Sequence, residues 1–322
     1  MKIRQWIARE SSKWLVAKKP NWDEIATTSA KLVPEPEIWR LFERAVADVC
    51  VALCLHRVST GERDEMTMSA YELDRFLEYA TSIRRADPWL TLSFDDGYAE
   101  AAEYIDTRAP RFPGVEWLLL VCPEKAELRA GFRWDLESGD ESERDPTSEN
   151  MRADLQRVGE SGRHPVASVA QCRSIERHAN VSLGNHTNCH FRVEDLPFDL
   201  ARMELHKSDE HFRRLFGDVK HFAFPFGKPG EDFDERHVEV LREQGDFLIW
   251  TTSRRPYHAA DRKPGAVLPR FPVNGSWTAS QVAFWIALLS MRWRDQVIDP
   301  KYDIPPPPES LPGGRLPPDG TE

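Results

Sequence analysis

Residues 89–97 read Trp-Leu-Thr-Leu-Ser-Phe-Asp-Asp-Gly, a mostly apolar stretch that ends in two adjacent acids and a glycine. An apolar stretch of this length is typical of a strand buried on both faces of a parallel sheet. Residues 49–55 and 115–121 have the same character, and segments with helical periodicity lie between the apolar stretches. This alternation predicts an α/β fold, either a parallel sheet or an irregular (β/α) barrel, with functional residues at the carboxyl ends of the strands.

Expected helices and strands continue this alternation along the chain. We expect a helix over residues 68–84, in which Ser69 and Glu72 suit an N-terminal capping box. The other expected helices are 99–105, 169–179, 198–216, 233–244 and 277–294, and the other expected strands are 181–184, 222–226, 247–252 and 267–273.

Composition divides the chain into one large domain and two flanking segments. Residues 1–48 predict an amphipathic helical extension, and residues 49–298 a single α/β domain. Residues 131–163 are rich in Glu, Asp, Ser and Gly and predict a solvated excursion from that domain. Residues 299–322, rich in Pro and Gly, predict an extended, disordered tail.

Charge and hydropathy exclude several classes of protein. The 322 residues include 43 Lys and Arg against 53 Asp and Glu, a net charge of −10, which argues against a nucleic-acid partner. The longest apolar run, residues 282–289, is too short to cross a bilayer. The amino-terminal residues have no continuous apolar stretch and no cleavage site, so we expect a cytoplasmic protein. Five scattered cysteines without a Cys-x-x-Cys pair do not resemble a disulfide framework.

Residues 186–190, His-Thr-Asn-Cys-His, carry two imidazoles four positions apart, directly after an expected short strand. On a helical turn this spacing would place both rings on one face, where they can share a metal ion. A carboxylate from elsewhere would complete a set of two His and one acid, which leaves open positions for water and substrate. Taken alone, His-x-x-x-His is weak evidence and Asp-Asp-Gly fits an ordinary turn. Because both follow strands of one α/β domain, they are expected to converge.

Four segments resemble, in order, the motifs of the polysaccharide deacetylase family, also called the NodB-homology domain. They are Leu-Thr-Leu-Ser-Phe-Asp-Asp-Gly at 90–97, Leu-Gly-Asn-His-Thr-Asn-Cys-His at 183–190, His-Phe-Ala-Phe-Pro-Phe-Gly at 221–227 and Leu-Pro-Arg-Phe-Pro-Val at 268–273. The resemblance implies a distorted (β/α) barrel that hydrolyses an N-acyl bond with one divalent metal ion. Zinc is the expected metal, although the ligand types also suit cobalt, nickel or iron.

The resemblance also implies a role for individual residues. Asp95 matches the general base, and Asp96, His186 and His190 match the metal ligands. Arg270 would orient the base through charge-assisted hydrogen bonds, with a plain structural salt bridge as the alternative. The family places a backbone N–H donor for the oxyanion near the residue that is Phe226 here. Phe224 and Phe226 stand where the family motif has Tyr, which leaves a backbone donor intact but removes any contact from a Tyr hydroxyl.

The acid that protonates the leaving amine is expected from an unusual place. Much of the family supplies it from a His in a late Leu-x-His motif, but no His follows His258 in this chain. Residues 53–58, Leu-Cys-Leu-His-Arg-Val, instead resemble the Tyr-His-Arg segment of the subgroup that includes the poly-N-acetylglucosamine deacetylases. His56 is therefore the candidate acid, with a structural His as the alternative. The other helical histidines, His206, His211 and His237, are expected to be solvated.

The expected substrate is an N-acylated amino sugar or glycan. The lack of a recognisable export segment favours a small, nucleotide-linked or lipid-linked sugar over a cell-wall polymer. Trp250 and Trp277 could stack on sugar rings, and packing in the core is the alternative for both. Two other functions stay open: a catalytically inactive carbohydrate-binding protein on a deacetylase fold, and an amidase that acts on a non-sugar amide. Retention of the base and all three ligands favours the enzyme.

Overall fold

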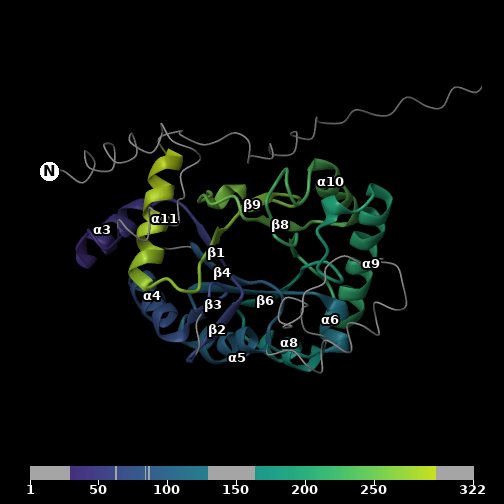
Figure 1. Cartoon of the computed structure of the whole chain (residues 1–322), viewed down its shortest axis with the longest axis horizontal. Coiled ribbons are helices and arrows are strands. Elements are labelled where there is room, and N and C mark those ends of the chain that lie inside the picture. Colours follow the sequence, from purple (N-terminus) through teal and green to yellow (C-terminus); the bar gives the residue numbers. More distant parts are fainter. Residues whose placement is uncertain (1–29, 62–63, 84, 86–87, 130–163, 295–322) are drawn as a thin grey trace, which may run out of the picture.

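A computed structural model of the chain describes residues 30–61, 64–83, 85, 88–129 and 164–294 (Figure 1). Three sequence predictions fall wholly or mainly outside these ranges: most of the amino-terminal extension, the acidic excursion at 131–163 and the tail at 299–322. Within the described residues, no helix is both long and apolar enough to cross a membrane. The cytoplasmic location expected from the sequence stays a prediction.

The centre of the molecule is a parallel sheet of eight strands in the order β10-β1-β4-β5-β6-β7-β8-β9. The strands are β1 Val51–Leu55, β4 Leu90–Phe94, β5 Val115–Val121, β6 Val181–Asn185, β7 His221–Ala223, β8 Leu248–Thr251, β9 Val267–Pro269 and β10 Phe271–Pro272. Each strand pairs with the next one around the sheet, and β10 returns to pair with β1. The result is a nearly closed barrel, which confirms the distorted (β/α) barrel that the family resemblance implies. The alternation of strands and helices alone had allowed either a parallel sheet or a barrel.

The barrel has one seam, between the two ends of the sheet. Strands β9 and β10 lie at those ends, and a single residue, Arg270, joins them in the chain. The backbone N–H of Arg270 donates to the Thr251 carbonyl at 2.8 Å, and its carbonyl accepts from Arg254 at 3.0 Å. The expected strand over residues 267–273 is therefore divided in two at Arg270, because the chain crosses from one edge of the sheet to the other at this point.

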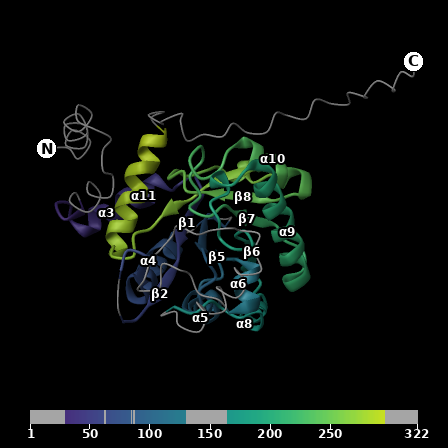
Figure 2. The same ribbon diagram turned by 45° about the vertical axis from the view of Figure 1, so that its right-hand side comes forward.

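Helices cover the outside of the barrel (Figures 1 and 2). They are α3 Glu35–Ala45, α4 Ala70–Ser82, α5 Ala99–Arg108, α6 Pro123–Leu128, α8 Val169–Ile175, α9 Phe198–Phe216, α10 Glu235–Gln244 and α11 Ala279–Arg294. In α9, buried residues such as Ala201, Leu205 and Phe212 recur at helical spacing, so one face packs on the barrel. Helix α3 lies beside α11 in both views, and its Phe42 belongs to the common hydrophobic core.

A small parallel sheet stands apart from the barrel strands. It consists of β2 Arg57–Ser59 and β3 Thr67–Ser69. Strand β3 leads directly into α4, and the predicted capping box at this junction is wrong: the Ser69 side chain makes no cap hydrogen bond. Glu72 instead accepts the N–H of Ala279 at 2.8 Å. Because that N–H begins α11, the Glu72 carboxylate caps a helix distant in sequence and ties α4 to it.

Several element boundaries differ from the predicted ones. The strand expected at 222–226 ends at Ala223, the helix expected at 169–179 ends at Ile175, and the helix expected from 233 begins at Glu235. Trp250 and Trp277 are 0% and 3% exposed, so the interpretation that they stack on sugar rings is wrong. Their indoles belong to the hydrophobic core.

Candidate metal centre

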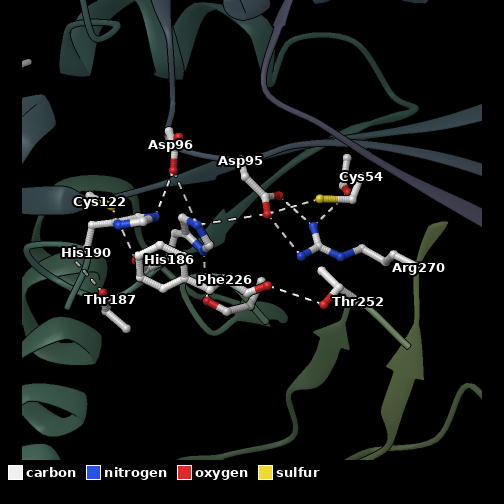
Figure 3. A network of polar contacts seen from close by, with 12 residues as sticks. Cys54, Asp95, Asp96, Cys122, His186, Thr187, His190, Phe226, Thr252 and Arg270 are labelled. Atoms are coloured by element: carbon white, nitrogen blue, oxygen red, sulfur yellow. Dashed lines mark hydrogen bonds and ion pairs between the residues drawn. The ribbon is translucent and has the colours of Figure 1, made fainter. Parts of the chain in front are cut away.

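The candidate residues converge at the carboxyl ends of several barrel strands (Figure 3). Asp95 and Asp96 follow β4, and His186 follows β6. His190 comes from the loop after β6, and Arg270 comes from the seam between β9 and β10. These side chains are 0–6% exposed. The parallel sheet thus gathers residues separated by up to 175 positions into one buried polar site.

Asp96 and the two histidines form the first half of the site. Oδ1 of Asp96 lies 3.0 Å from Nε2 of His190 and 3.4 Å from Nε2 of His186. One possible ligand atom from each residue lies within 4.8 Å of the others, so the three could share one ion. Within the described parts of the chain, the buried Oδ1 atom of Asp96 has no hydrogen bond of ordinary geometry. Two imidazole nitrogens around such an oxygen form a donor set that suits zinc.

The loop that carries the histidines is not the helical turn expected from their spacing. Residues 186–190 form no helix, and both Thr187 (φ 61°) and His190 (φ 68°) have left-handed backbone conformations. The Thr187 hydroxyl accepts the N–H of His190 at 3.1 Å, which closes a compact turn. Both rings reach the same side because of this turn and its two left-handed residues, and not because of the repeat of a helix.

Backbone conformation also determines where Asp96 points. Asp95 extends the strand ladder, since its N–H donates to the Leu55 carbonyl at 2.8 Å. Asp96 has a left-handed φ of 72°, and Gly97 follows with a φ of 71°. The left-handed φ of Gly97 favours glycine at this position, although a Cβ there would meet the Val121 backbone only at an ordinary contact distance of 3.4 Å. The turn directs two adjacent carboxylates to different neighbours.

A backbone carbonyl sets the orientation of His186. Its Nδ1 atom lies 2.8 Å from the Ala223 oxygen, which can only accept, so Nδ1 carries the hydrogen. The Nε2 atom is then left to face Asp96. Burial alone would raise the pKa of Asp96, but the adjacent His190 and His186 outweigh it and hold the pKa well below its usual range. Burial lowers the pKa of His190 despite the attraction of Asp96, which favours the neutral ring that a metal ligand requires.

Asp95 and Arg270 form the second half of the site. The two arms of the Arg270 guanidinium contact the two oxygens of Asp95, with Nη1–Oδ1 at 2.5 Å and Nη2–Oδ2 at 3.0 Å. Nη1 also donates to the Ser93 hydroxyl at 2.8 Å. Burial would raise the pKa of Asp95, but Arg270 and then His186 outweigh it, so the pKa is lowered and the carboxylate stays ionised. Its Oδ2 lies 3.9 Å from Nε2 of His186, on the side of the first half.

Cys54 is a site residue that the sequence analysis did not identify. Its thiol donates to Oδ2 of Asp95 at 3.3 Å, and burial raises its pKa well above the usual value, so it stays protonated. Four of the five cysteines are buried, and burial alone does not distinguish Cys54 from the others. Alternation along β1 could have identified Cys54, because it lies two residues before His56 and therefore faces the same side of the strand.

His56 lies directly after β1 and is partly buried. It forms a second group of possible ligands with Cys54 and Asp95, within 4.8 Å of one another. A cation there is disfavoured because the Arg270 guanidinium already occupies both oxygens of Asp95. The same proximity places His56 beside the candidate base.

The prediction that His211 and His237 are solvated is wrong. His237 is 1% exposed, and its Nδ1 accepts the N–H of Asp234 at 3.1 Å in the cap of α10. That nitrogen is therefore already used, although His237 forms a third group of possible ligands with Asp234 and Glu194. His211 contacts the Asn188 side chain at 2.8 Å, close to the loop of the candidate ligands.

Phe226 stands at the outer edge of the site. It has a left-handed φ of 63°, and its carbonyl accepts from the Thr252 hydroxyl at 3.2 Å. Its ring meets the His190 ring edge to face at 5.2 Å, and the Arg192 guanidinium lies 4.7 Å from its centroid. The side chain is 51% exposed. An open aromatic surface thus lies next to a candidate metal ligand.

Comparison with known proteins shows similarity in structure but not in sequence. No protein-family model and no curated protein matches the chain. The deacetylase PplD of Streptococcus pyogenes, solved in complex with acetate, matches with a TM-score of 0.52 at 11% identity, over 73% of this chain and 96% of that chain. A polysaccharide deacetylase from Bacillus cereus gives 0.51 at 13%, over 74% and 68%. A de-N-acetylase from Aggregatibacter actinomycetemcomitans gives 0.50 at 14%, over 74% and 100%.

Proposed function

On the polysaccharide deacetylase fold that the chain shares with these solved structures, we propose a metal-dependent hydrolase that removes an N-acyl group, expected to be acetyl, from an amino sugar of a glycan. One observation carries the proposal: an ionised carboxylate with its own buried cation, Asp95 with Arg270, faces a separate trio of Asp96, His186 and His190. Metal-dependent hydrolysis needs both a base and a place for a cation, and here the two groups lie side by side.

The trio would hold the cation through Oδ1 of Asp96 and Nε2 of each histidine. We propose zinc because borderline nitrogen donors and one carboxylate oxygen suit it. When bound, such a cation lowers the pKa of a coordinated water and polarises the acyl oxygen of the substrate.

Asp95 acts as the general base that accepts the proton of the attacking water. Arg270 keeps Asp95 ionised and fixes its plane through two hydrogen bonds. The backbone N–H of Phe226 donates to the developing oxyanion. This role needs no Tyr hydroxyl, so the Phe residues of this motif are compatible with it. His56, beside Asp95 at the end of β1, protonates the departing amine.

The alternative of an inactive binding protein requires the loss of a base or of a ligand. Asp95 and all three candidate ligands are present, and the burial and ion pairing of Asp95 with Arg270 go beyond what sugar binding alone would need. The second alternative, an amidase for a non-sugar amide, differs from the proposed enzyme only in its substrate. A comparison of substrates distinguishes the two.

The test is acetate release by the purified, zinc-loaded protein. We expect acetate from N-acetylglucosamine oligomers and little from an acetylated lysine peptide, since the exposed Phe226 ring beside the site suits a sugar face. Chelation should abolish the activity, and zinc should restore it. Asp95→Asn should be at least about 100-fold slower, whereas Asp246→Asn, a change at an exposed carboxylate, should match the parent. Activity that survives complete chelation, or an Asp95→Asn variant as fast as the parent, contradicts the proposal.

A further inference from the structure

The loop between His186 and His190 contains two strained positions, Thr187 and His190, both left-handed although neither is glycine. Such conformations persist only where neighbouring groups determine them. The Thr187 hydroxyl supplies one contact from within the loop. Further contacts come from outside it, from helix α9, which begins at Phe198 and packs against β6.

One face of α9 contacts this segment at three successive turns. Oε1 of Glu204 accepts the N–H of Asn188 at 2.9 Å and the N–H of Cys189 at 3.2 Å. The Ser208 hydroxyl donates to the Asn185 side chain at 2.7 Å. His211 contacts the Asn188 side chain at 2.8 Å. Positions 204, 208 and 211 share one helix face, so a rigid element holds the segment from end to end.

Glu204 makes the most direct of these contacts. Asn188 and Cys189 are the residues immediately before His190, and they lie in no strand that could pair their N–H groups. A carboxylate oxygen that accepts two consecutive N–H groups fixes the orientation of the peptide planes there. Because those planes lead to the peptide whose N–H the Thr187 hydroxyl holds, they constrain the position of the His190 Cα and thereby of its ring.

We infer that Glu204 is a positioning residue for the candidate metal centre: it holds the backbone at 188–189 so that the His190 ring faces Asp96 and His186. The inference rests on the proposed function for the role of His190 as a ligand. Glu204 touches neither the metal nor the substrate, and it acts through His190. Outer contacts of this kind generally change metal affinity by about 10- to 100-fold when they are removed.

The first arm of the test measures zinc affinity by competition with a chelator. Glu204→Ala should raise the Kd for zinc by about 10- to 100-fold, and Glu204→Met, which keeps the length of the side chain but no acceptor, should do the same if the alanine variant folds poorly. Glu204→Gln retains an acceptor oxygen and should stay within a few-fold of the parent. Glu210→Ala, at an exposed position of the same helix, is the matched control and should leave the Kd unchanged.

The second arm uses hydrogen exchange in the metal-free protein and does not depend on zinc binding. The amides of Asn188 and Cys189 should exchange faster in Glu204→Met than in the parent, whereas the amides of β4 and β5 should not change. If the parent binds no zinc, the proposed function fails, and this arm still decides the role of Glu204. Parental zinc affinity together with parental exchange at 188–189 in Glu204→Met would overturn the inference.

Discussion

Asp95 and Asp96 are neighbours in the chain, yet the structure surrounds them with opposite kinds of partner. Asp95 meets a permanent cation, the Arg270 guanidinium, on both of its oxygens. Asp96 meets the imidazoles of His186 and His190, and no arginine or lysine of the described residues forms an ion pair with it. The guanidinium already occupies both oxygens of Asp95, whereas an acid that faces only imidazoles can share a cation with them. The neighbours, and not the residue type, distinguish the two proposed roles.

The strongest test of this difference between Asp95 and Asp96 is to replace each carboxylate with an amide in turn. Asp95→Asn should lower kcat/KM by about 10²- to 10⁴-fold, because a general base contributes that much, and it should retain one zinc per chain. Asp96→Asn should lose zinc as well as activity. Metal analysis after dialysis and acetate-release kinetics measure both quantities. Equal zinc contents in the two variants would mean that the acids are not divided in this way.

The next test removes the counter-ion of Asp95. Arg270→Met should lower the free energy of unfolding by about 3–5 kcal/mol, since a buried carboxylate is left uncompensated. Urea unfolding of the metal-free protein measures this change. Combining Arg270→Met with Asp95→Asn removes the stranded charge and should recover much of the loss. A double variant no more stable than Arg270→Met alone would show that Arg270 contributes by packing and not by charge.

His221, a buried imidazole outside the candidate site, makes the stability of the fold depend on pH. Burial lowers the pKa of His221 from 6.5 to about 4, and its Nδ1 accepts the Trp250 indole N–H at 3.1 Å, which requires the neutral ring. The folded pKa lies below the unfolded one, so the stabilisation is complete above pH 6.5 and is lost as the pH falls toward 4. The shift corresponds to roughly 3 kcal/mol.

Unfolding free energies measured from pH 7 to pH 4 check this expectation. The control is His221→Gln, which is expected to be less stable at neutral pH but to lose less stability on acidification. Between pH 4 and 6.5 the unfolding free energy of the parent should rise more steeply with pH than that of the variant. The difference between the two slopes corresponds to at most one bound proton. Parallel curves for the parent and the variant would exclude His221 as a source of the acid sensitivity.

The smallest expected effect concerns Cys54, which shares Oδ2 of Asp95 with Arg270. Cys54→Ala removes a weak donor and should destabilise the fold by about 0.5–1.5 kcal/mol, with a change in kcat/KM of less than about ten-fold because Arg270 continues to hold the base. Cys172→Ala, another buried cysteine, is the control for loss of volume alone. A larger loss of activity for Cys54→Ala than for Arg270→Met would reverse the order of importance.

Strand positions and the identity of the candidate residues were predictable from the sequence, because both depend on local patterns. The apolar run before Asp95 identifies a buried strand, and acids or histidines at the end of such a strand indicate a site. The fold implied by the four motifs is confirmed. The roles of Asp95, Asp96, His186, His190, Arg270, Phe226 and His56 stay predictions that the variants above address.

What could not be predicted depends on contacts between distant segments. The spacing of His186 and His190 suggested a helical turn, but two left-handed residues determine the observed loop. Glu72 matches a local cap by spacing, yet its carboxylate reaches α11. The place of His237 in a helical surface pattern suggested exposure, but the side chain is buried and takes part in the cap of α10. In each case tertiary contacts override a local preference. No pattern of neighbouring residues in a single sequence identifies contacts between distant segments.

The single-residue seam of the barrel limits how this chain can be re-engineered. Arg270 sets both the distance between β9 and β10 and the position of the guanidinium against Asp95. An added residue or a new chain terminus at 269–271 would therefore both widen the barrel and move the Arg270 guanidinium away from Asp95. The exposed turn near Gly230, where a Cβ would meet no atom within 4 Å, neither sets the spacing of β9 and β10 nor positions the guanidinium. Circular permutants and inserted reporter domains should open the chain at that turn and leave the seam closed.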